Sequence, residues 1–352
     1  ATSQVLTQFI RFGSNLILTR LLFPEAFGIM ALVNVCILGI NMFSDIGIEA
    51  SVIQNARSDN DFLNTAWTLQ IIRGFILFIG LSIIAFPFSN YYDEKLLLYI
   101  LPVVGLGVSF DGFKSISLYT ESRKLHLGRI QTLEISATIT SSILMILIAL
   151  ITHSIWALVI GNVSVYIFRV IFSHIFFPFK HRILFDKESC NDIISFGTWI
   201  FISSILTFLA QSGDRLIFGK LIPIGLLGVY SIAFLISNMP SELISKISFR
   251  IIFPSLSKVK RAGGSVNDVY NRSSRVLIFI SGIFSIGLAL SGPWLILHIY
   301  DDRYSDAGWI IRLLSIGIWL GCIIHIQAAT LLSLARTKWL AFSNLARLLW
   351  LC

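Results

Sequence analysis

Long, nearly uncharged apolar runs follow one another along almost the whole chain. A helix that crosses a bilayer needs about 20 mainly apolar residues, and ten runs of about this length occur before the start of an eleventh. These runs are far longer than a barrel strand of about ten residues and do not alternate in polarity, which excludes a transmembrane β-barrel. Because backbone groups in lipid must be satisfied internally, we expect helices. The expected spans are 2–20, 26–52, 62–87, 97–118, 131–151, 155–178, 192–219, 226–253, 275–297 and 307–333, with 339–352 opening an eleventh.

The composition also indicates a polytopic membrane protein in a lipid bilayer. Of the 352 residues, 55% are hydrophobic and 13% are charged. A soluble domain carries about a quarter charged residues, so a soluble globule of this composition would expose large apolar patches. The formal net charge of +8 does not require a nucleic-acid partner, and we expect none, because membrane proteins collect Lys and Arg in cytoplasmic loops.

The charge of the loops predicts the orientation of the chain. Alternate loops form two sets, of which one holds 14 Lys and Arg and the other only four. The positive-inside rule places the richer set, and the start of the chain, in the cytoplasm. The richer set comprises 53–61, 119–130, 179–190, 254–275 and 334–338. Because the chain begins without Met inside one apolar stretch and stops inside another, we expect it to be part of a longer protein.

The chain contains an internal repeat. Residues 13–32 read GSNLILTRLLFPEAFGIMAL, and residues 213–232 read GDRLIFGKLIPIGLLGVYSI. Each copy has an apolar helix end, a basic residue (Arg20 or Lys220), a tight turn and a glycine in the next helix (Gly28 or Gly228). Coincidence among apolar residues does not account for the matching basic residue and glycine.

The second copy is offset from the first by six spans, an even number, so both copies enter the membrane in the same direction. Parallel repeats of this kind build some secondary transporters from two similar halves. We therefore expect an all-α protein of two six-helix bundles facing a central cavity, with the second bundle incomplete. The expected parts are a first lobe at 1–178, a connecting cytoplasmic loop at 179–190 and a second lobe at 191–352.

Polar residues form matching stripes on the two repeated helices. Helical spacing places the members of each stripe on one face, so we expect both stripes to line one shared, wet space. The stripes are Gln4, Gln8, Arg11 and Asn15 in the first helix, and Ser204, Thr207, Gln211 and Arg215 in the seventh.

Two arginines lie deep in the expected membrane. Arg11 lies about 13 Å along its helix from Arg20, and Arg73 lies in the middle of the third span. A buried charge costs about 2.5–3.5 kcal/mol on insertion scales, so each must face a cavity or satisfy a structural role. The alternative to a cavity role is a hydrogen bond to neighbouring carbonyl groups. Arg215, near the end of its helix and next to Asp214, could equally extend to the membrane surface.

Carboxylates inside the spans are candidates for coupling to an ion. Asp45 and Glu49 lie one turn apart and could hold a proton or Na⁺, or could simply be solvated. Glu242 precedes Lys246 by four residues, the order that favours a local ion pair, although it too is a candidate. Asp111 and Lys114 are expected to pair locally.

Other function classes find no support in the sequence. The six His residues show no metal-ligand spacing, and Gly263–Gly264 is not followed by the Lys-Ser of a phosphate-binding loop. We expect no metal, no cofactor and no ATPase domain, so an ion gradient or the gradient of the substrate would drive any transport.

Several segments resemble the Wzx-type oligosaccharide flippases, the polysaccharide transport branch of the superfamily that also holds the MATE exporters and the lipid II flippases. The segments that carry the resemblance are RLLFPEAFGIMALV (20–33), SDIGIEASVIQ (44–54), SFGTWIF (195–201), DRLIFGK (214–220), LGVYSIAFLISNMP (227–240) and FPSLSK (253–258).

The resemblance implies a MATE-like fold in a bacterial inner membrane and no enzymatic activity. The implied substrate is an undecaprenyl-diphosphate-linked repeat unit, moved to the outer leaflet for capsule, O-antigen or exopolysaccharide assembly. A diphosphate matches the fork of a guanidinium group, which makes the arginines and their neighbouring polar residues candidate ligands; polymerase machinery is a candidate partner. The candidates are Arg11, Arg73, Arg215, Gln8, Asn15 and Gln211.

Two alternatives remain open. A cation-coupled exporter of amphipathic small molecules has the same fold, but it favours acidic residues at mid-membrane, whereas the central charges here are largely basic. A polysaccharide polymerase or ligase predicts a large catalytic loop outside the membrane, and the longest such loop, 298–306, has nine residues.

Overall fold

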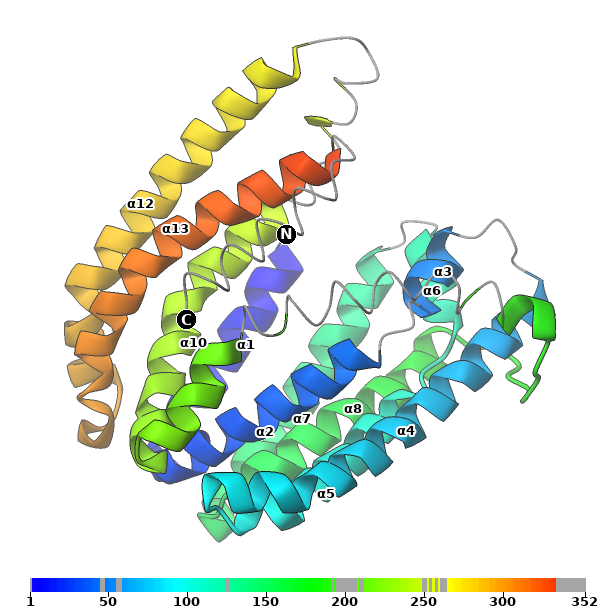
Figure 1. Cartoon of the computed structure of the whole chain (residues 1–352), viewed down its shortest axis with the longest axis horizontal. Coiled ribbons are helices and arrows are strands. Elements are labelled where there is room, and N and C mark those ends of the chain that lie inside the picture. The colour runs from blue at the N-terminus through cyan, green and yellow to red at the C-terminus, as the bar shows by residue number, and fades with distance from the viewer. Residues whose placement is uncertain are drawn as a thin grey trace. The chain divides into compact units, whose positions relative to one another are not determined.

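The computed structural model describes residues 2–44, 48–54, 59–123, 127–190, 193, 208, 212–248, 252, 255–256, 259 and 265–333. Wherever these residues form regular structure, that structure is helical (Figure 1). The chain divides into two compact units, Ala1–Ile224 and Gly225–Cys352, which are described separately. The lobe boundary expected at 179–190 stays a prediction.

The helices of the first unit are α1 (Thr2–Leu21), α2 (Pro24–Phe43), α3 (Ile48–Gln54), α4 (Asn60–Tyr92), α5 (Leu96–Asp111), α6 (Ser117–Arg123), α7 (Leu127–Thr152) and α8 (Trp156–Phe176). Residues 212–221 are the described part of a further helix. The second unit contains α10 (Ile224–Ile247), α12 (Val266–Ile299), the short 3₁₀ helix η2 (Asp302–Tyr304) and α13 (Ala307–Ser333).

Seven of the described helices are long and apolar enough to cross a membrane, namely α2, α4, α7, α8, α10, α12 and α13. Their outward faces are apolar as well. On α4, the side chains of Ile76, Ile79, Ile83 and Phe86 share one face and are between 54% and 68% exposed. A stripe of this kind is unfavourable in water and suits lipid, which confirms the polytopic membrane class.

Three expected spans differ from the structure. Helix α1 is helical as predicted, but with its polar stripe it is not one of the seven helices that are apolar enough to cross a membrane. The expected span 97–118 is wrong from residue 112 onwards, because α5 ends at Asp111 and the chain turns before α6. At this turn the carbonyl group of Gly112 accepts a 2.8 Å hydrogen bond from Gln70 Nε2 instead of continuing the helix. The expected span 26–52 is likewise divided into α2 and α3, and residues 45–47 lie outside the described chain.

Two helices are longer than their expected spans. Helix α4 has 33 residues and α12 has 34, so each is about 50 Å long, against about 30 Å for the hydrocarbon core. Helix α12 already begins at Val266, where the side chain of Ser265 caps it by accepting from Asp268 N. The expectation that 254–275 is entirely a loop is therefore wrong from residue 266 onwards.

The internal repeat has the same backbone geometry in both copies. The first helix of each copy ends at residue 21 or 221, and the next begins at Pro24 or Ile224. The amide of Leu22 bonds to the carbonyl of Leu18 at 2.8 Å, and the amide of Ile222 bonds to the carbonyl of Phe218 at 3.0 Å. This agreement supports the repeat inferred from the sequence.

Small residues allow close helix packing in the first unit. A Cβ atom on Gly74 of α4 would lie 2.8 Å from the backbone oxygen of Ser109 in α5, and one on Gly161 of α8 would lie 2.6 Å from Met145 in α7. Close backbone approach at small residues drives association of helices in lipid, because the hydrophobic effect does not operate between them there.

The second unit is built on the pair α12 and α13. Ser285 on α12 donates to the carbonyl of Ser315 on α13, and Trp319 Nε1 donates to the carbonyl of Ile278 at 3.3 Å. Leu277 of α12 and Cys322 of α13 belong to a buried cluster that also contains Ile244 of α10.

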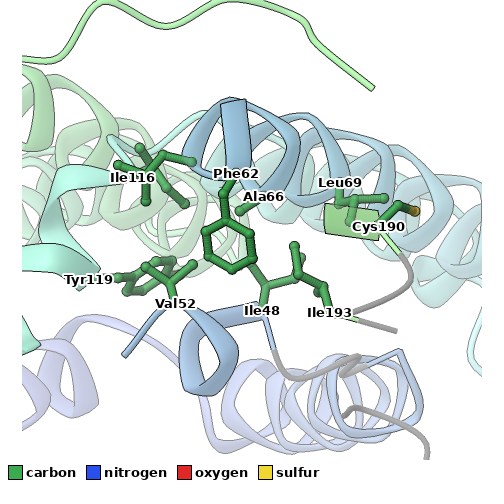
Figure 2. Packing of buried hydrophobic residues seen from close by; sticks show 10 residues of the cluster. Ile48, Val52, Phe62, Ala66, Leu69, Ile116, Tyr119, Cys190 and Ile193 are labelled. Carbon is green, nitrogen blue, oxygen red and sulfur yellow. The ribbon is translucent and has the colours of Figure 1, made fainter. Parts of the chain in front are cut away.

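An apolar cluster joins α3, α4 and α6 in the first unit. Figure 2 shows Phe62 of α4 at its centre, with Ile48 and Val52 of α3 on one side and Ile116 and Tyr119 nearby. Phe62 has no solvent exposure. The two short helices therefore form a small core of their own beside the first turns of α4.

Residues 177–190, here called the strap, pack beside this cluster. The ring of His181 lies 4.6 Å from that of Trp67 and 5.0 Å from those of His174 and Phe179. The amide of Ile116 donates to His181 Nε2 at 3.3 Å, which requires that this nitrogen is unprotonated. Burial, with a smaller effect of His174, lowers the pKa of His181 from 6.5 to about 4.

We expect Gly74→Ala to destabilise the first unit, because the new methyl group meets backbone atoms of α5 that cannot turn aside. Overpacking of this kind costs about 1–3 kcal/mol. The control is Gly80→Ala on the same helix, where the nearest atom is the tip of Ile40 at 3.9 Å. Thermal unfolding of the purified protein in detergent measures both, and an equal melting temperature for the two variants would contradict the close packing.

The free energy of unfolding should fall as the pH drops from about 6.5 to about 4. In this range the unfolded chain binds a proton at His181 and the folded chain does not, so the stability present above pH 6.5 is lost progressively and the loss is complete below pH 4. His181→Gln keeps an acceptor for Ile116 and should reduce the loss of melting temperature between pH 7.5 and 5. The exposed His153→Asn serves as control, and an unchanged slope in His181→Gln would refute the assignment.

Candidate functional site

The polar face of α1 carries the first candidate residues. The side chain of Arg11 is exposed, whereas Gln8 and Asn15 are half-buried and both have interaction partners. The same side of α1 also carries the buried residues Ser14, which bonds back to the carbonyl of Ile10 at 2.9 Å, and Leu18, three and seven residues after Arg11, and α1 packs against α7. Arg11 therefore lies on the side of α1 that packs within the first unit, although its own side chain is exposed.

Two ion pairs lie near Arg11. On α8, Arg169 contacts Glu134 of α7, with Nη2 and Nε at 2.9 and 3.1 Å from Oε2. Lys114 Nζ lies 2.6 Å from Asp111 Oδ2, which confirms the predicted local pair. The charges of Arg169, Lys114 and Asp111, together with that of Arg11, act on the hydroxyl group of Tyr166. These side chains from α1, α5, α7 and α8 therefore share one charged region of the first unit.

Arg73 of α4 binds the end of α2. Its Nη2 donates to the carbonyl of Asn41 at 2.9 Å, and its Nε donates to Ser44 Oγ at 3.1 Å. A cation at a helix C-terminus satisfies a free carbonyl group and interacts favourably with the helix dipole. This is the structural role that the sequence left open for Arg73. The two bonds use two of the five N–H groups of the guanidinium, so a role in binding substrate stays a prediction.

The candidate ion-coupling residues lie in different parts of the chain. Asp45 is outside the described residues, and Glu49 is exposed on α3 with an interaction partner. The charges of Glu49 and Arg73 both act on Tyr119 of α6, so a cation does occur in this neighbourhood. Glu242 of α10 is half-buried and also has a partner, while the side chains of Lys246 and Arg250 lie outside the described residues.

The second polar stripe is described only at its end. Arg215 is half-buried and has an interaction partner; Ser204, Thr207 and Gln211 lie outside the described residues.

The helix at 212–221 instead shows contacts with α2 and α4 that the sequence did not predict. Tyr92 Oη donates to the carbonyl of Leu216 at 3.0 Å, and Lys220 Nζ lies 2.8 Å from Asp93 Oδ2. A Cβ atom on Gly219 would lie 2.5 Å from Leu32 and 2.8 Å from Tyr92.

Sequence reasoning missed three residues of the charged region, Glu134, Tyr166 and Arg169, and it missed Tyr119 of α6 near Glu49 and Arg73. A signal was present for two of them, because Glu134 and Arg169 are opposite charges inside the consecutive spans 131–151 and 155–178. Antiparallel neighbouring helices bring such residues together, so their charges could have been paired from the sequence. The two tyrosines carry no comparable signal.

Solved structures with the same fold include two transporters. The structure of a lipid II flippase MurJ in its inward closed conformation matches with a TM-score of 0.72 at 14% identity, covering 97% of this chain and 77% of that one. A multidrug resistance transporter of the MATE family in its inward-facing conformation matches with a TM-score of 0.68, also at 14% identity, covering 97% and 84%. The expected MATE-like fold is confirmed.

Curated relatives cover most of this chain. The teichuronic acid biosynthesis protein TuaB of Bacillus subtilis is 23% identical over 300 residues, which is 85% of this chain and 62% of the relative. The lipopolysaccharide biosynthesis protein WzxC of Escherichia coli is 19% identical over 305 residues, or 85% and 61%. The chain thus spans about three fifths of the length of these relatives. The model of the family described as "Polysaccharide biosynthesis protein" matches residues 17–309. With this match over more than four fifths of its length, the chain belongs to the polysaccharide biosynthesis protein family.

Proposed function

We propose that the protein moves undecaprenyl-diphosphate-linked oligosaccharide repeat units across the bacterial inner membrane, from the cytoplasmic to the periplasmic leaflet. The product would enter capsule, O-antigen or exopolysaccharide assembly, where a polymerase is the expected partner. Support comes from the family match and from the names of the relatives, which concern teichuronic acid and lipopolysaccharide. These names favour a saccharide substrate over the small molecules of a drug exporter.

The observation that carries the proposal is the exposed guanidinium of Arg11 in the middle of α1. Near it, Arg169 and Lys114 are already balanced by Glu134 and Asp111. Among the described residues of this charged region, Arg11 is then the cation best placed to receive an incoming anion. A diphosphate offers paired oxygens that fit the fork of a guanidinium. Gln8 and Asn15, one turn to either side, are proposed to contact the same head group, with Arg73, Arg215 and Gln211 as further ligands.

The driving force is proposed to be an ion gradient. Asp45, Glu49 and Glu242 are the candidate carboxylates for H⁺ or Na⁺, and the start of the chain is assigned to the cytoplasm by its loop charges. Binding of a cation to a carboxylate near the substrate site would change the local charge, which is how an ion can bias one conformation over another.

Alternating access also requires that contacts between the lobes break and reform. By the repeat, the helix at 212–221 begins the second lobe, and its contacts with α2 and α4 lie at the end of the bundle assigned to the periplasm. We assign to Tyr92, Asp93, Gly219 and Lys220 the role of closing this end. The ion pair itself contributes little, since Asp93 is 81% exposed, so closure depends mainly on the buried contact of Tyr92.

Arg11→Ala should weaken substrate binding by about 2 kcal/mol, the worth of a hydrogen bond to a charged group, or roughly thirtyfold. Cells that lack the full-length gene and express this variant should accumulate lipid-linked repeat units and lose surface polymer. Arg11→Lys should retain part of the activity, because Lys keeps the charge but not the fork.

The control is Lys95→Ala, which removes an exposed cation from the turn between α4 and α5. Protein amount in the membrane and melting temperature show whether each variant folds. Full complementation by Arg11→Ala at normal protein amount would overturn the assignment of Arg11.

Cross-linking Asp93→Cys to Lys220→Cys should stop transport, because it holds the proposed contact closed, and reduction should restore it. The measurement uses full-length protein whose native cysteines are replaced, with a short thiol-specific cross-linker. Each single cysteine variant, treated alike, is the control. Normal transport by fully cross-linked protein would show that this contact need not open.

A further inference from the structure

The strap is held against α4 by its backbone. Three amide groups donate to side chains of α4: Arg182 N to Asn64 Oδ1 at 2.9 Å, Leu184 N to Thr68 Oγ1 at 3.1 Å and Asp186 N to Thr65 Oγ1 at 3.1 Å. The three accepting residues are buried, with exposures of 6%, 6% and 0%. In Figure 1 the green segment that follows α8 lies beside the start of α4. The strap is therefore a fixed part of the first unit.

The strap nevertheless presents large apolar side chains outwards. The three amides that bind α4 are two residues apart, as in an extended chain, so alternate side chains share a face. Ile183 and Phe185 lie on one such face and are 80% and 63% exposed. A segment fixed in this way cannot turn these side chains inwards, so something apolar must cover them.

The position of the strap along α4 indicates what covers it. The residues that bind the strap belong to the first nine of α4, and the sequence from Leu69 to Tyr92 is mainly apolar, with Arg73 as its one charged residue. From Leu69 to Tyr92 the helix is about 36 Å long, already enough for the hydrocarbon core of about 30 Å. The preceding turns, and the strap beside them, therefore lie at the level of the lipid headgroups.

The charges of the strap suit this level. Lys180, Arg182 and Lys187 are exposed, and Lys and Arg side chains are attracted to a leaflet that contains anionic lipids. The carboxylate of Asp186 is bound by Ser189, through its amide at 2.9 Å and its hydroxyl at 2.5 Å. Glu188 is exposed and has an interaction partner, which leaves three cations against one outward carboxylate.

We propose that the strap is a docking surface for anionic phospholipids of the cytoplasmic leaflet. Ile183 and Phe185 insert below the headgroups, and the three cations contact the phosphates above them. The surface fixes the depth and tilt of the first unit in the membrane. It does not depend on what the protein transports.

Spin labels at Ile183→Cys and Phe185→Cys test this in full-length protein without native cysteines, reconstituted in vesicles of phosphatidylethanolamine and phosphatidylglycerol. Both labels should be more accessible to oxygen than to a water-soluble nickel complex. Ile79→Cys on the apolar face of α4 gives the lipid reference, and Asp302→Cys gives the water reference. Accessibility equal to that of Asp302→Cys at both positions would overturn the proposal.

A second measurement tests the charges. The combined variant Lys180→Gln, Arg182→Gln and Lys187→Gln should bring the labels closer to water in the anionic vesicles, to the level that the unaltered strap shows in phosphatidylcholine vesicles. An unchanged depth would contradict a role for anionic lipid. Labels that are shielded in native membranes but wet in pure lipid would instead indicate a protein on this surface.

Discussion

A charged side chain inside a bilayer must find a partner or water, and this constraint organises the first unit. Leaving a charge at the centre of a helix in lipid costs about 2.5–3.5 kcal/mol on insertion scales. Arg169 meets Glu134 across α7 and α8, and Arg73 meets the end of α2. Both interactions connect different helices, so they set the helix packing as well as satisfying the charge. The exposed side chain of Arg11 makes no ion pair with another described residue, so its charge would be satisfied by water or by an anion beside it.

Much of the fold follows from the lengths of the apolar runs, because a span is local in sequence and its requirement is one of length and polarity. The breaks between α2 and α3 and between α5 and α6 were not predicted. At the second break, the helix ends where Gln70, about forty residues away, binds the carbonyl groups of Gly112 and Lys114. The sequence around the end of α5 contains no pattern that indicates this contact with a side chain of α4. The early start of α12 had a local signal in Ser265, which precedes Asp268 by three residues.

The candidate site, like the fold, was predicted only where it depends on local sequence. Periodicity correctly places Gln8, Arg11 and Asn15 on one side of α1, because this depends only on the helix. It cannot distinguish Arg11 from Arg73, since the difference arises from the partners of Arg73, which lie 29 and 32 residues away in the chain. The second stripe reaches the described structure only at Arg215. The strap shows the same limit: its sequence identifies a basic loop, but only the buried Asn64, Thr65 and Thr68 explain its fixed shape.

The two copies of the repeat show which features the shared turn requires and which features belong to one copy alone. Both copies end a helix, form the same amide bond four residues back and begin a new helix at the same position, although few side chains are shared. What the copies share most clearly is a basic residue before the turn and a buried glycine after it. A basic residue in the last turn interacts favourably with the helix dipole in either copy, so it is kept for a local reason. The side chain that this basic residue contacts can therefore differ between the two copies. In the second copy, Lys220 contacts Asp93 and the ring of Tyr91. In the second copy, the basic residue of the turn therefore makes a contact that is not needed to form the turn itself.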